Sequence, residues 1–592
     1  MKRFWAIILI LFLFVIFTGF EYYRNLEKEV LNVITPVIIQ VDLNNNKVFD
    51  EGENICIADT QSFTSNLSYS NEKIAESLNI SPKDSVALGY LADEFADKTL
   101  FNQKVKIKFN GKKDQNCRYA QVYVNKQNYS DLLKNAGFGI SDGKPANNQK
   151  FNENLNKAKT FKLVILNHKS NKYHKLDCKY GLAAHDAIVI FVQQLPHGVS
   201  PCKFCHIDKK TKKLIKENKI PAYPLLISDG SLKLFLTDFT TKLKPDNNCD
   251  NLACKEILNQ INSSKSRIDI AAYGWDSIPA LENALLNAKR RGVTLRVVFD
   301  QMSGDKIYPE TANLIKIADF SKGDLTDSKR NSGMLMHNKF IIIDNQRVIT
   351  GSMNFSRTGI SGFNANNMVL INSKEIASEY SQEFEQMLSG KFHKNKSKIQ
   401  HKNYIIGDSK VTALFSPQDL ITTNSLIPLI QNSKNYIYIP AFLITHNTLI
   451  DSLISAKKRG VNIKIITDAT YSSSNNKRIK RLRENGILLK VENYAGKMHS
   501  KTLIIDDKYL VIGSMNFSYA GEVKNDENVL IIENTRLAKY YKGYFEYIWQ
   551  KIPERYLKHG VRAEGKYSIG SCSDGIDNNY DGKIDKEDAG CH

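Results

Sequence analysis

Charged side chains are missing from the stretch Phe4–Phe20, which is almost wholly apolar and follows a Met-Lys-Arg start. Its length is at the short limit for a membrane span, and the basic start would stay on the inner side. A small-x-small cleavage site is also missing, because bulky aromatics follow Thr18-Gly19, and this disfavours a cleaved signal peptide. We therefore predict that residues 1–24 form a membrane anchor, with everything after Glu21 outside the cytoplasm. A secreted chain with a signal peptide is the alternative.

Acidic residues are in short supply relative to basic ones. The 592 residues include 62 Asp and Glu against 82 Lys and Arg, which gives a formal net charge of +20. This charge favours polyanionic partners, either nucleic acid or an acidic lipid surface. Because the lysines are spread along the whole chain, a general Lys/Asn/Ile-rich composition is the alternative explanation. The length is too great for a single core and predicts several domains.

One pattern occurs twice, namely His-x-Lys, four residues, Asp, six residues and Gly-Ser-x-Asn. The copies run MHNKFIIIDNQRVITGSMN from Met336 and MHSKTLIIDDKYLVIGSMN from Met498. Residues two apart in a strand point to the same side, so each His is predicted to share a pocket with its Lys. Converging His, Lys and Asn side chains suit a tetrahedral oxyanion, chiefly phosphate. The candidate residues are His337, Lys339, Asp344, Ser352 and Asn354 in the first copy, and His499, Lys501, Asp506, Ser514 and Asn516 in the second.

Each copy is predicted to fold as a hairpin. The apolar run FIIID or TLIID indicates a buried strand that ends in a polar turn at Asp344-Asn345 or Asp506-Asp507. A second strand returns to Gly351 or Gly513. There we expect the missing Cβ to let a bound group approach the backbone.

This spacing, present twice in one chain, resembles the signature of the phospholipase D superfamily. The resemblance implies that one His attacks phosphorus to form a phosphohistidine, while the other protonates the leaving oxygen and then activates water. The lysines and asparagines would hold the non-bridging oxygens and stabilise the transition state. Asp344 and Asp506 would orient the imidazoles or hold them in the right protonation state. A core histidine beside a snorkelling lysine would explain one copy of the motif, but agreement of two copies at every position argues against it.

The flanking sequences repeat as well, which indicates a duplicated domain. ALLNAKRRGVTLRVVFD, ending at Asp300, and SLISAKKRGVNIKIITD, ending at Asp468, each predict an amphipathic helix, a Gly stop and a buried strand. The predicted fold class is α/β, with two phospholipase D-type lobes at 225–390 and 404–556 that form a pseudo-dimer around one pocket. No second chain would be needed to complete that pocket. The basic segment Lys391–Lys402 is predicted to link the lobes.

The two repeats differ at one position after the Gly-Ser. NDENVLII in the second repeat supplies Glu527, the residue usual in the family, whereas NANNMVLI in the first repeat has Asn366. An amide cannot take up a proton, so the two halves are not expected to be equivalent. By resemblance we assign His337 as the nucleophile and His499 as the acid, with the reverse assignment still open.

Four side chains around 160–210 have the spacing of a structural zinc site. YHKLDC and PCKFC supply His174, Cys178, Cys202 and Cys205. The set resembles the zinc module of the DNA-repair regulator Ada, with His in place of its first Cys. His206 is an alternative fourth ligand, and a Cys-x2-Cys disulfide is the alternative to metal binding.

The other six cysteines pair without remainder, which fits an oxidising compartment. Cys249 and Cys254 close a short loop, and Cys572 and Cys591 bracket the C-terminal tail. Cys56 and Cys117 are left together within one upstream segment.

That upstream segment, residues 33–145, resembles a degenerate thermonuclease-type OB barrel in its order of helix and strands. Asp59 and Arg118 occupy matching positions, but the family's catalytic Glu falls on Ser62 and its first Arg on Asn54. Without these two groups the thermonuclease reaction is not expected. We predict a binding domain or a scaffold.

The tail at 568–592 contains the pattern of a calcium loop, CSDGIDNNYDGKIDKEDAGC. Gly582 stands at the sixth position, where the loop turns sharply. An acidic solvated tail is the alternative explanation. The predicted ligands are Asp577, Asn579, Asp581, Asp585 and Asp588.

Three functions remain open from the sequence. The first is an extracytoplasmic nuclease of the phospholipase D superfamily, favoured by the basic charge and by GSMNFS, which resembles the family's small nucleases. The second is a phospholipase D acting on phosphatidylcholine-type lipids, or a cardiolipin-synthase-like phosphatidyltransferase, held at the membrane by the anchor. The third is a non-catalytic protein for DNA uptake. No catalytic cofactor is expected, because the lysines and a protonated imidazole can do what Mg²⁺ does elsewhere.

Overall fold

A computed structural model of the chain describes residues 26–45, 52–115, 117–184, 187–196, 198–205, 213, 220–324, 333–472 and 476–591. The predicted anchor at 1–24 and the alternative zinc ligand His206 lie outside these ranges. Within them, no helix is long and apolar enough to cross a membrane. The chain divides into two compact units, residues 1–219 with 564–592 and residues 220–563.

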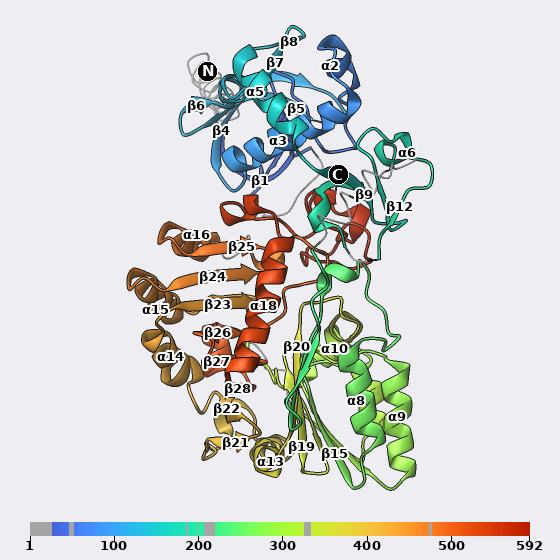
Figure 1. Cartoon of the computed structure of the whole chain (residues 1–592), viewed down its shortest axis with the longest axis vertical. Helices are drawn as coiled ribbons and strands as arrows, with labels where there is room; N and C mark the ends of the chain where they lie inside the picture. The colour runs from blue at the N-terminus through green and yellow to red at the C-terminus, as the bar shows by residue number, and fades with distance from the viewer. Residues whose placement is uncertain are drawn as a thin grey trace, which may run out of the picture. The chain divides into compact units, whose positions relative to one another are not determined.

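The unit at 220–563 contains two lobes, and the first is built on a mixed eight-stranded sheet (Figure 1). Its strand order is β13-β14-β20-β19-β18-β15-β16-β17, in which β15, β16 and β17 run parallel and the other pairs are antiparallel. The strands are β13 Leu226–Ser228, β14 Leu232–Leu236, β15 Arg267–Ala272, β16 Thr294–Phe299, β17 Phe320–Gly323, β18 Lys339–Ile343, β19 Arg347–Gly351 and β20 Asn367–Asn372.

The second lobe repeats this sheet strand for strand, in the order β21-β22-β28-β27-β26-β23-β24-β25. Two sheets of identical connectivity confirm the predicted α/β pseudo-dimer. The strands are β21 Tyr404–Ile406, β22 Ser409–Ser416, β23 Tyr436–Ala441, β24 Asn462–Thr467, β25 Leu488–Val491, β26 Leu503–Ile505, β27 Tyr509–Gly513 and β28 Glu527–Glu533.

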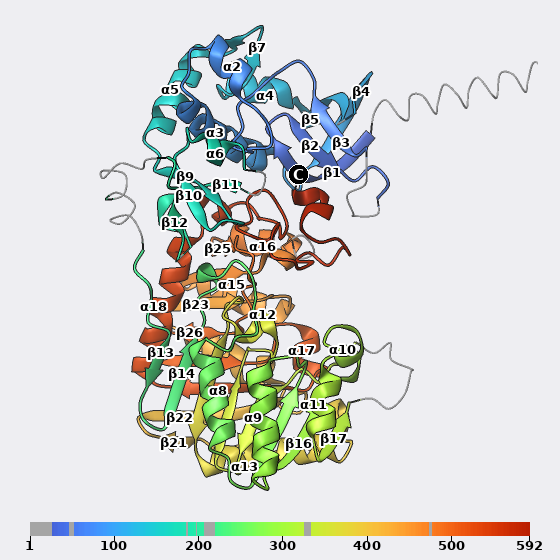
Figure 2. The same ribbon diagram turned by 90° about the vertical axis from the view of Figure 1, so that its right-hand side faces the viewer.

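Amphipathic helices cover the sheets, and α8 and α9 lie side by side on the first (Figure 2). Their buried residues, such as Ile257 and Leu285, join Ile270 and Val297 of the strands in one apolar core. The helices of this unit are α8 Leu252–Asn262, α9 Pro279–Arg290, α10 Gln301–Lys306, α11 Thr311–Ile317, α12 Arg357–Ile360, α13 Lys374–Leu388, α14 Ile427–Asn432, α15 Asn447–Lys458, α16 Asn476–Glu484, α17 Tyr519–Val523 and α18 Thr535–Lys551.

The segment between the lobes, predicted as a basic linker, carries a buried charge network. The Lys396 ammonium is buried and pairs with Asp526, 2.8 Å away, and with Glu383. His393 lies between Asp324 and Asp526, and although burial opposes its charge, these carboxylates raise its pKa to about 9. Part of the basic segment therefore holds the lobes together and does not face solvent.

The unit formed by 26–219 and 564–591 begins with a closed five-stranded barrel. Strands β3-β2-β1-β4-β5 are neighbours in that order, and β3 also pairs with β5, which closes the barrel. The barrel elements are β1 Leu26–Thr35, β2 Ile38–Val41, β3 Asn54–Ile57, α3 Pro82–Leu100, β4 Lys104–Lys113 and β5 Arg118–Val124. Smaller elements complete this part of the chain, namely α2 Glu72–Ser77, β6 Gln127–Asn128, α4 Tyr129–Asn135, β7 Ile140–Ser141, β8 Lys144–Pro145 and α5 Asn148–Lys159.

A small sheet, β11-β9-β10-β12, follows the barrel in the same unit. Its elements are β9 Leu163–Asn167, β10 Lys172–His174, α6 Lys179–Leu182, β11 Ala187–Phe191 and β12 Ser200–Pro201. The tail from 564 returns to the barrel, where the Lys566 ammonium donates to the Ile34 carbonyl (2.8 Å) and lies 3.6 Å from the buried Asp93 carboxylate.

The structure contains the three disulfides that the cysteine count predicted. They join Cys56 to Cys117, Cys249 to Cys254 and Cys572 to Cys591.

Candidate active site

The two His-x-Lys motifs meet at one site because each is held by the opposite lobe. Met336 forms a parallel bridge with Asp526, and Ala365 forms one with Met498. Each motif then leads into a central strand of its own sheet, β18 or β26. His337 and His499 are 6% and 7% exposed, so both imidazoles are removed from bulk water but still reachable.

Each imidazole is oriented by a residue of the other repeat. The His337 Nδ1 lies 2.8 Å and 2.9 Å from the two carboxylate oxygens of Glu527. The His499 Nδ1 lies 3.0 Å from both the Ser352 carbonyl and the Asn366 side-chain oxygen. A carbonyl only accepts, so the His499 Nδ1 carries the proton and its Nε2 keeps a lone pair.

The sequence predicted that Glu527 and Asn366 differ in function, and the structure shows that the difference acts crosswise. Glu527 of the second repeat contacts His337 of the first repeat, and Asn366 of the first repeat contacts His499 of the second. The serines of the motifs fix these two side chains, since the Ser514 hydroxyl donates to Glu527 (2.6 Å) and the Ser352 hydroxyl donates to Asn366 (3.0 Å). The predicted serines therefore hold the groups that orient the imidazoles.

The site contains two buried lysines, one from each motif. Lys339 and Lys501 are buried, and each ammonium donates to the carbonyl of the His two residues before it. Each also lies over an aromatic ring, 4.8 Å from the centroid of Tyr273 and 5.1 Å from that of Phe442. Burial lowers the pKa of Lys339 to about 7, although Glu527 opposes the shift, and burial and Lys339 hold the pKa of Lys501 well below its usual range.

The same burial disfavours the charged form of both imidazoles. Burial, Lys339 and Lys501 together hold the pKa values of His337 and His499 well below the usual range. Burial also raises the pKa of the Glu527 carboxyl to about 8. A bound anion would reverse these conditions, because its negative charge favours the charged form of every cationic group in the pocket.

Asn354 and Asn516 occupy equivalent places at the ends of the returning strands. The Asn354 amide donates to the Tyr308 hydroxyl (3.3 Å). The side-chain oxygens of both asparagines are buried without a hydrogen-bond partner in the described part of the chain. A buried amide with unused hydrogen-bonding capacity is suited to a polar ligand.

The prediction that Asp344 and Asp506 orient the imidazoles is wrong. Both lie at the far ends of strands β18 and β26, and about seven residues of extended chain, roughly 23 Å, separate each from its His. Asp344 accepts backbone N–H groups from residues 265–267, and Asp506 accepts them from residues 434–436. Their role is to fix the hairpin turn against the start of β15 or β23, as their positive φ angles of 54° and 55° also indicate.

The motif glycines have a structural reason different from the predicted one. A Cβ on Gly351 would lie 2.3 Å from the Asn367 carbonyl oxygen, and one on Gly513 would lie 2.2 Å from that of Asn528. The absence of a Cβ therefore allows close approach of the neighbouring strand, β20 or β28, and does not make room for a bound group. The residue that orients an imidazole stands at the start of that strand, Asn366 just before β20 and Glu527 as the first residue of β28.

Sequence reasoning missed two carboxylates and two rings. Asp300 accepts the Met336 N–H (3.0 Å) and Asp468 accepts that of Met498 (2.8 Å), so each aspartate fixes the backbone just before the His of a motif. The rings of Tyr273 and Phe442 pack against His337 and His499, with centroids 4.6 and 5.1 Å apart. An alignment of the two repeats could have indicated these residues, because Asp300 matches Asp468 and Tyr273 matches Phe442.

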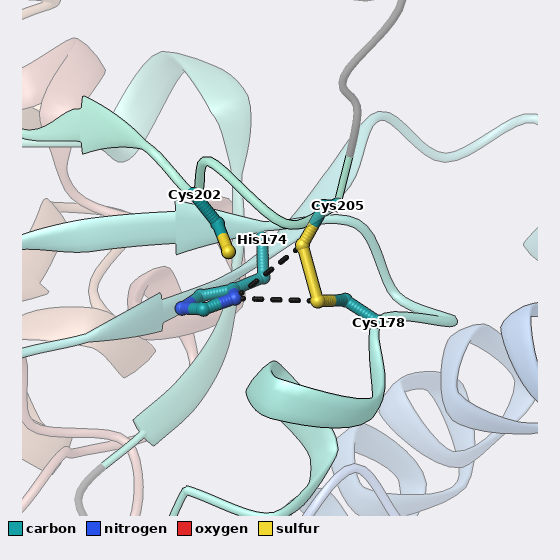
Figure 3. Close-up of side chains that lie close together, drawn as sticks. All are labelled: His174, Cys178, Cys202 and Cys205. Carbon is teal, nitrogen blue, oxygen red and sulfur yellow. Dashed lines mark hydrogen bonds between the residues drawn. A yellow bond between two sulfur atoms is a disulfide. The ribbon is translucent and has the colours of Figure 1, made fainter.

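The predicted zinc ligands form a buried cluster that could bind a zinc ion (Figure 3). The ligand atoms of His174, Cys178, Cys202 and Cys205 all lie within 4.8 Å of one another. In this structure Cys178 and Cys205 are joined as a disulfide and Cys202 is a free, buried thiol. The four predicted ligands therefore do lie together. The disulfide between Cys178 and Cys205 is the alternative to metal binding by these two cysteines.

The predicted calcium loop turns at Gly582 as expected, but not every predicted ligand side chain points into the loop. Gly582 has φ +90°, and its N–H donates to Asp577 (2.9 Å). The Asp585 carboxylate instead accepts the N–H groups of Asp574 and Gly575. Calcium binding stays a prediction.

The positions compared with the thermonuclease site lie on or beside the barrel, because Arg118 begins β5 and Asp59 and Ser62 follow β3. The resemblance to that family stays a prediction. Ser62 is buried, and the Arg118 guanidinium stacks on Phe109 at 4.0 Å. Asp59 lines an open hollow with Lys112 and Lys113.

Comparison with known proteins places these features in a family. A family model described as "Cardiolipin synthase, PLD-like domain" matches residues 257–388 and 426–549. A phospholipase D of Rickettsia bellii (strain RML369-C) is 31% identical over 150 residues, which are 25% of this chain and 74% of the relative. The mitochondrial cardiolipin hydrolase of Mus musculus is 38% identical over 100 residues, 17% of this chain and 45% of the relative. The solved structure of NucT from Helicobacter pylori is 26% identical and covers 26% of this chain and 100% of NucT, with a TM-score of 0.24.

The pH dependence of turnover should follow the charge of Lys339. With a small chromogenic diester, kcat/KM should fall above about pH 7, because the ammonium with a pKa of about 7 loses its proton as the pH rises. Glu527→Gln removes a carboxyl whose ionised form, reached as the pH rises towards its pKa of about 8, favours the charged ammonium, so the alkaline limb should move to lower pH. Glu533→Gln, in the same strand but half-exposed, should leave the limb in place. An alkaline limb that does not move in Glu527→Gln would contradict this account.

Proposed function

This chain belongs to the phospholipase D superfamily and is a phosphodiesterase, and we propose that it cleaves nucleic acid outside the cytoplasm through a phosphohistidine. The observation that carries the two-step mechanism is the pair of imidazoles held in one pocket by crosswise hydrogen bonds through Nδ1. This arrangement directs both Nε2 atoms to one substrate, one for attack and one for proton transfer.

The unequal partners of the two imidazoles support His337 as the nucleophile. When Nε2 of His337 bonds to phosphorus, the ring becomes cationic, and the Glu527 carboxylate at 2.8 Å can balance that charge. His499 has only neutral partners, so its imidazolium depends on the negative charge of the bound diester. His499 is therefore suited to carry a proton only when substrate is present, and to give it to the leaving oxygen.

Lysine and asparagine side chains supply the remaining electrostatic stabilisation. Lys339 and Lys501 neutralise the non-bridging oxygens, whose charge otherwise repels a nucleophile. Asn354 and Asn516 would hold the same oxygens by donating hydrogen bonds from their side-chain amide N–H groups. After the leaving group departs, neutral His499 takes a proton from water, which then attacks the phosphohistidine and releases His337.

Nucleic acid is the substrate that we favour, and phospholipid is the alternative. The net charge of +20 supports a polyanionic polymer. The exposed face of α16 adds Lys477, Lys480 and Arg481 in the second lobe. The names of the relatives, phospholipase D and cardiolipin hydrolase, favour the lipid alternative. Three disulfides support a location outside the cytoplasm.

The substrate test offers the purified protein two phosphodiesters side by side. Single-stranded DNA and phosphatidylcholine vesicles are incubated with equal amounts of enzyme in EDTA, with the His337→Asn variant as the blank. We expect cleavage of DNA and no release of choline. Choline release without DNA cleavage would replace the nuclease proposal by the lipid alternative.

Replacing either catalytic histidine should abolish turnover, because each does work that the other cannot. His337→Asn and His499→Asn should both lose at least about 10²-fold in kcat. With an activated leaving group, only His499→Asn should accumulate a phospho-enzyme, detectable by intact-protein mass spectrometry. His446→Asn, a buried histidine paired with Glu522, is the matched control. Near-full activity in His499→Asn would show that the second repeat is structural.

We further propose that the His174 cluster holds one structural zinc ion. Zinc needs thiolates, so the metal-bound protein should have Cys178 and Cys205 reduced and not joined as a disulfide. Elemental analysis should give one zinc per chain in the wild type and none in Cys178→Ser/Cys202→Ser. Equal zinc content in the two proteins, or none in either after refolding with zinc, would rule out this site.

A further inference from the structure

Two large aromatic side chains lie exposed and in contact beside the Cys/His cluster. Tyr180 is 48% exposed and Phe204 is 68% exposed, yet their ring centroids are only 4.9 Å apart. Rings of this size usually bury their faces in a core or an interface. Neither ring belongs to the apolar core of this unit, so packing within the fold does not account for the pair.

The cluster holds this pair in place from both sides. Tyr180 stands in α6 two residues after Cys178, and Phe204 immediately precedes Cys205. The sulfur atoms of both cysteines lie within 3.5 Å of the His174 Nδ1. Gly181, next to Tyr180, packs against His174 so closely that a Cβ there would lie 2.8 Å from it. Close packing around Gly181 and the disulfide between Cys178 and Cys205 therefore hold the backbone on both sides of the ring pair in this structure.

The surroundings of the pair are basic. The Lys179 ammonium lies 5.1 Å from the centre of the Tyr180 ring, and Lys203, next to Phe204, is exposed. The module at 161–205 has six lysines and two aspartates: Lys162, Lys169, Lys172, Lys175, Lys179 and Lys203 against Asp177 and Asp186. A ligand that suits this surface carries flat apolar faces and repeated negative charges.

We propose that Tyr180 and Phe204 form a stacking platform for single-stranded nucleic acid, a binding site distinct from the catalytic pocket. An unpaired base stacks on the exposed Phe204 face, while Lys179 and Lys203 contact the adjoining phosphates. Single strands are specified because the bases of a duplex have no free faces. The proposal deepens the proposed function, since it takes the same class of polymer as its ligand.

An anionic membrane surface is the other partner that basic and aromatic groups attract, and the two differ in what they require of the ring. A lipid surface takes up apolar area of any shape, whereas base stacking needs a flat π-face. Phe204→Leu keeps apolar area and removes the face, and Phe204→Trp enlarges the face. The ratio of their affinities therefore separates the two partners.

The test measures binding of fluorescein-labelled oligo-dT by anisotropy, with every variant made in the non-cleaving His337→Asn background. Tyr180→Ala/Phe204→Ala and Phe204→Leu should each raise Kd about tenfold or more, and Phe204→Trp should bind at least as well as Phe204. Phe320→Ala, which removes a ring that is 60% exposed in the other unit, is the matched control and should not change Kd. In the background with His337 intact, Tyr180→Ala/Phe204→Ala should turn over a small chromogenic diester at the wild-type rate.

Each other outcome has a defined meaning. An unchanged Kd in Tyr180→Ala/Phe204→Ala, or equal Kd values in Phe204→Leu and Phe204→Trp, overturns the platform. Loss of binding to phosphatidylglycerol vesicles with oligo-dT binding intact overturns it in favour of a membrane surface. If the wild type fails to cleave DNA but oligo-dT binding depends on Phe204, the platform stands and the proposed substrate falls.

Discussion

The catalytic pocket depends on one exchange of hydrogen bonds between the repeats, in which Glu527 holds His337 and Asn366 holds His499. Neither lobe alone contains a correctly oriented imidazole. The exchange continues behind the pocket, where the Asn528 amide donates to Asn338 (2.8 Å) and the Asn367 amide donates to Thr502 (3.0 Å). These polar groups are buried, so each depends on its partner in the other lobe. Loss of one such partner, with the remaining group still buried, would lower the free energy of unfolding by about 1–3 kcal/mol.

The exchange also gives the two nearly identical motifs different electrostatic surroundings. Burial and the two lysines hold the pKa values of both imidazoles low, and the single carboxylate at Glu527 breaks the symmetry. With a carboxylate in place of Asn366, both imidazoles would have equivalent partners. One amide and one carboxylate thus give the two imidazoles different surroundings within a duplicated framework.

Features that repeat within the sequence were predictable, and features that depend on contacts between distant segments were not. The spacing of His, Lys, Ser and Asn predicted the pocket and the duplicated sheets, because each copy supported the other. The spacing did not show that Glu527 reaches across to the first repeat, since this depends on the docking of the lobes. It misassigned Asp344, because this residue follows the end of strand β18 that is farther from His337. The burial of Lys396 was likewise hidden, because composition shows its charge and not the carboxylates that meet it.

The return of the tail to the barrel has a consequence for biosynthesis. Residues 564–591 belong to the same compact unit as 26–219, so the two catalytic lobes are inserted in sequence between its parts. On the ribosome, both lobes can complete their sheets before Lys566 emerges to meet Ile34 and Asp93. A nascent barrel must wait through the synthesis of the whole catalytic region before it gains its last contacts. The barrel-containing unit is therefore the first to begin synthesis and the last to complete its fold.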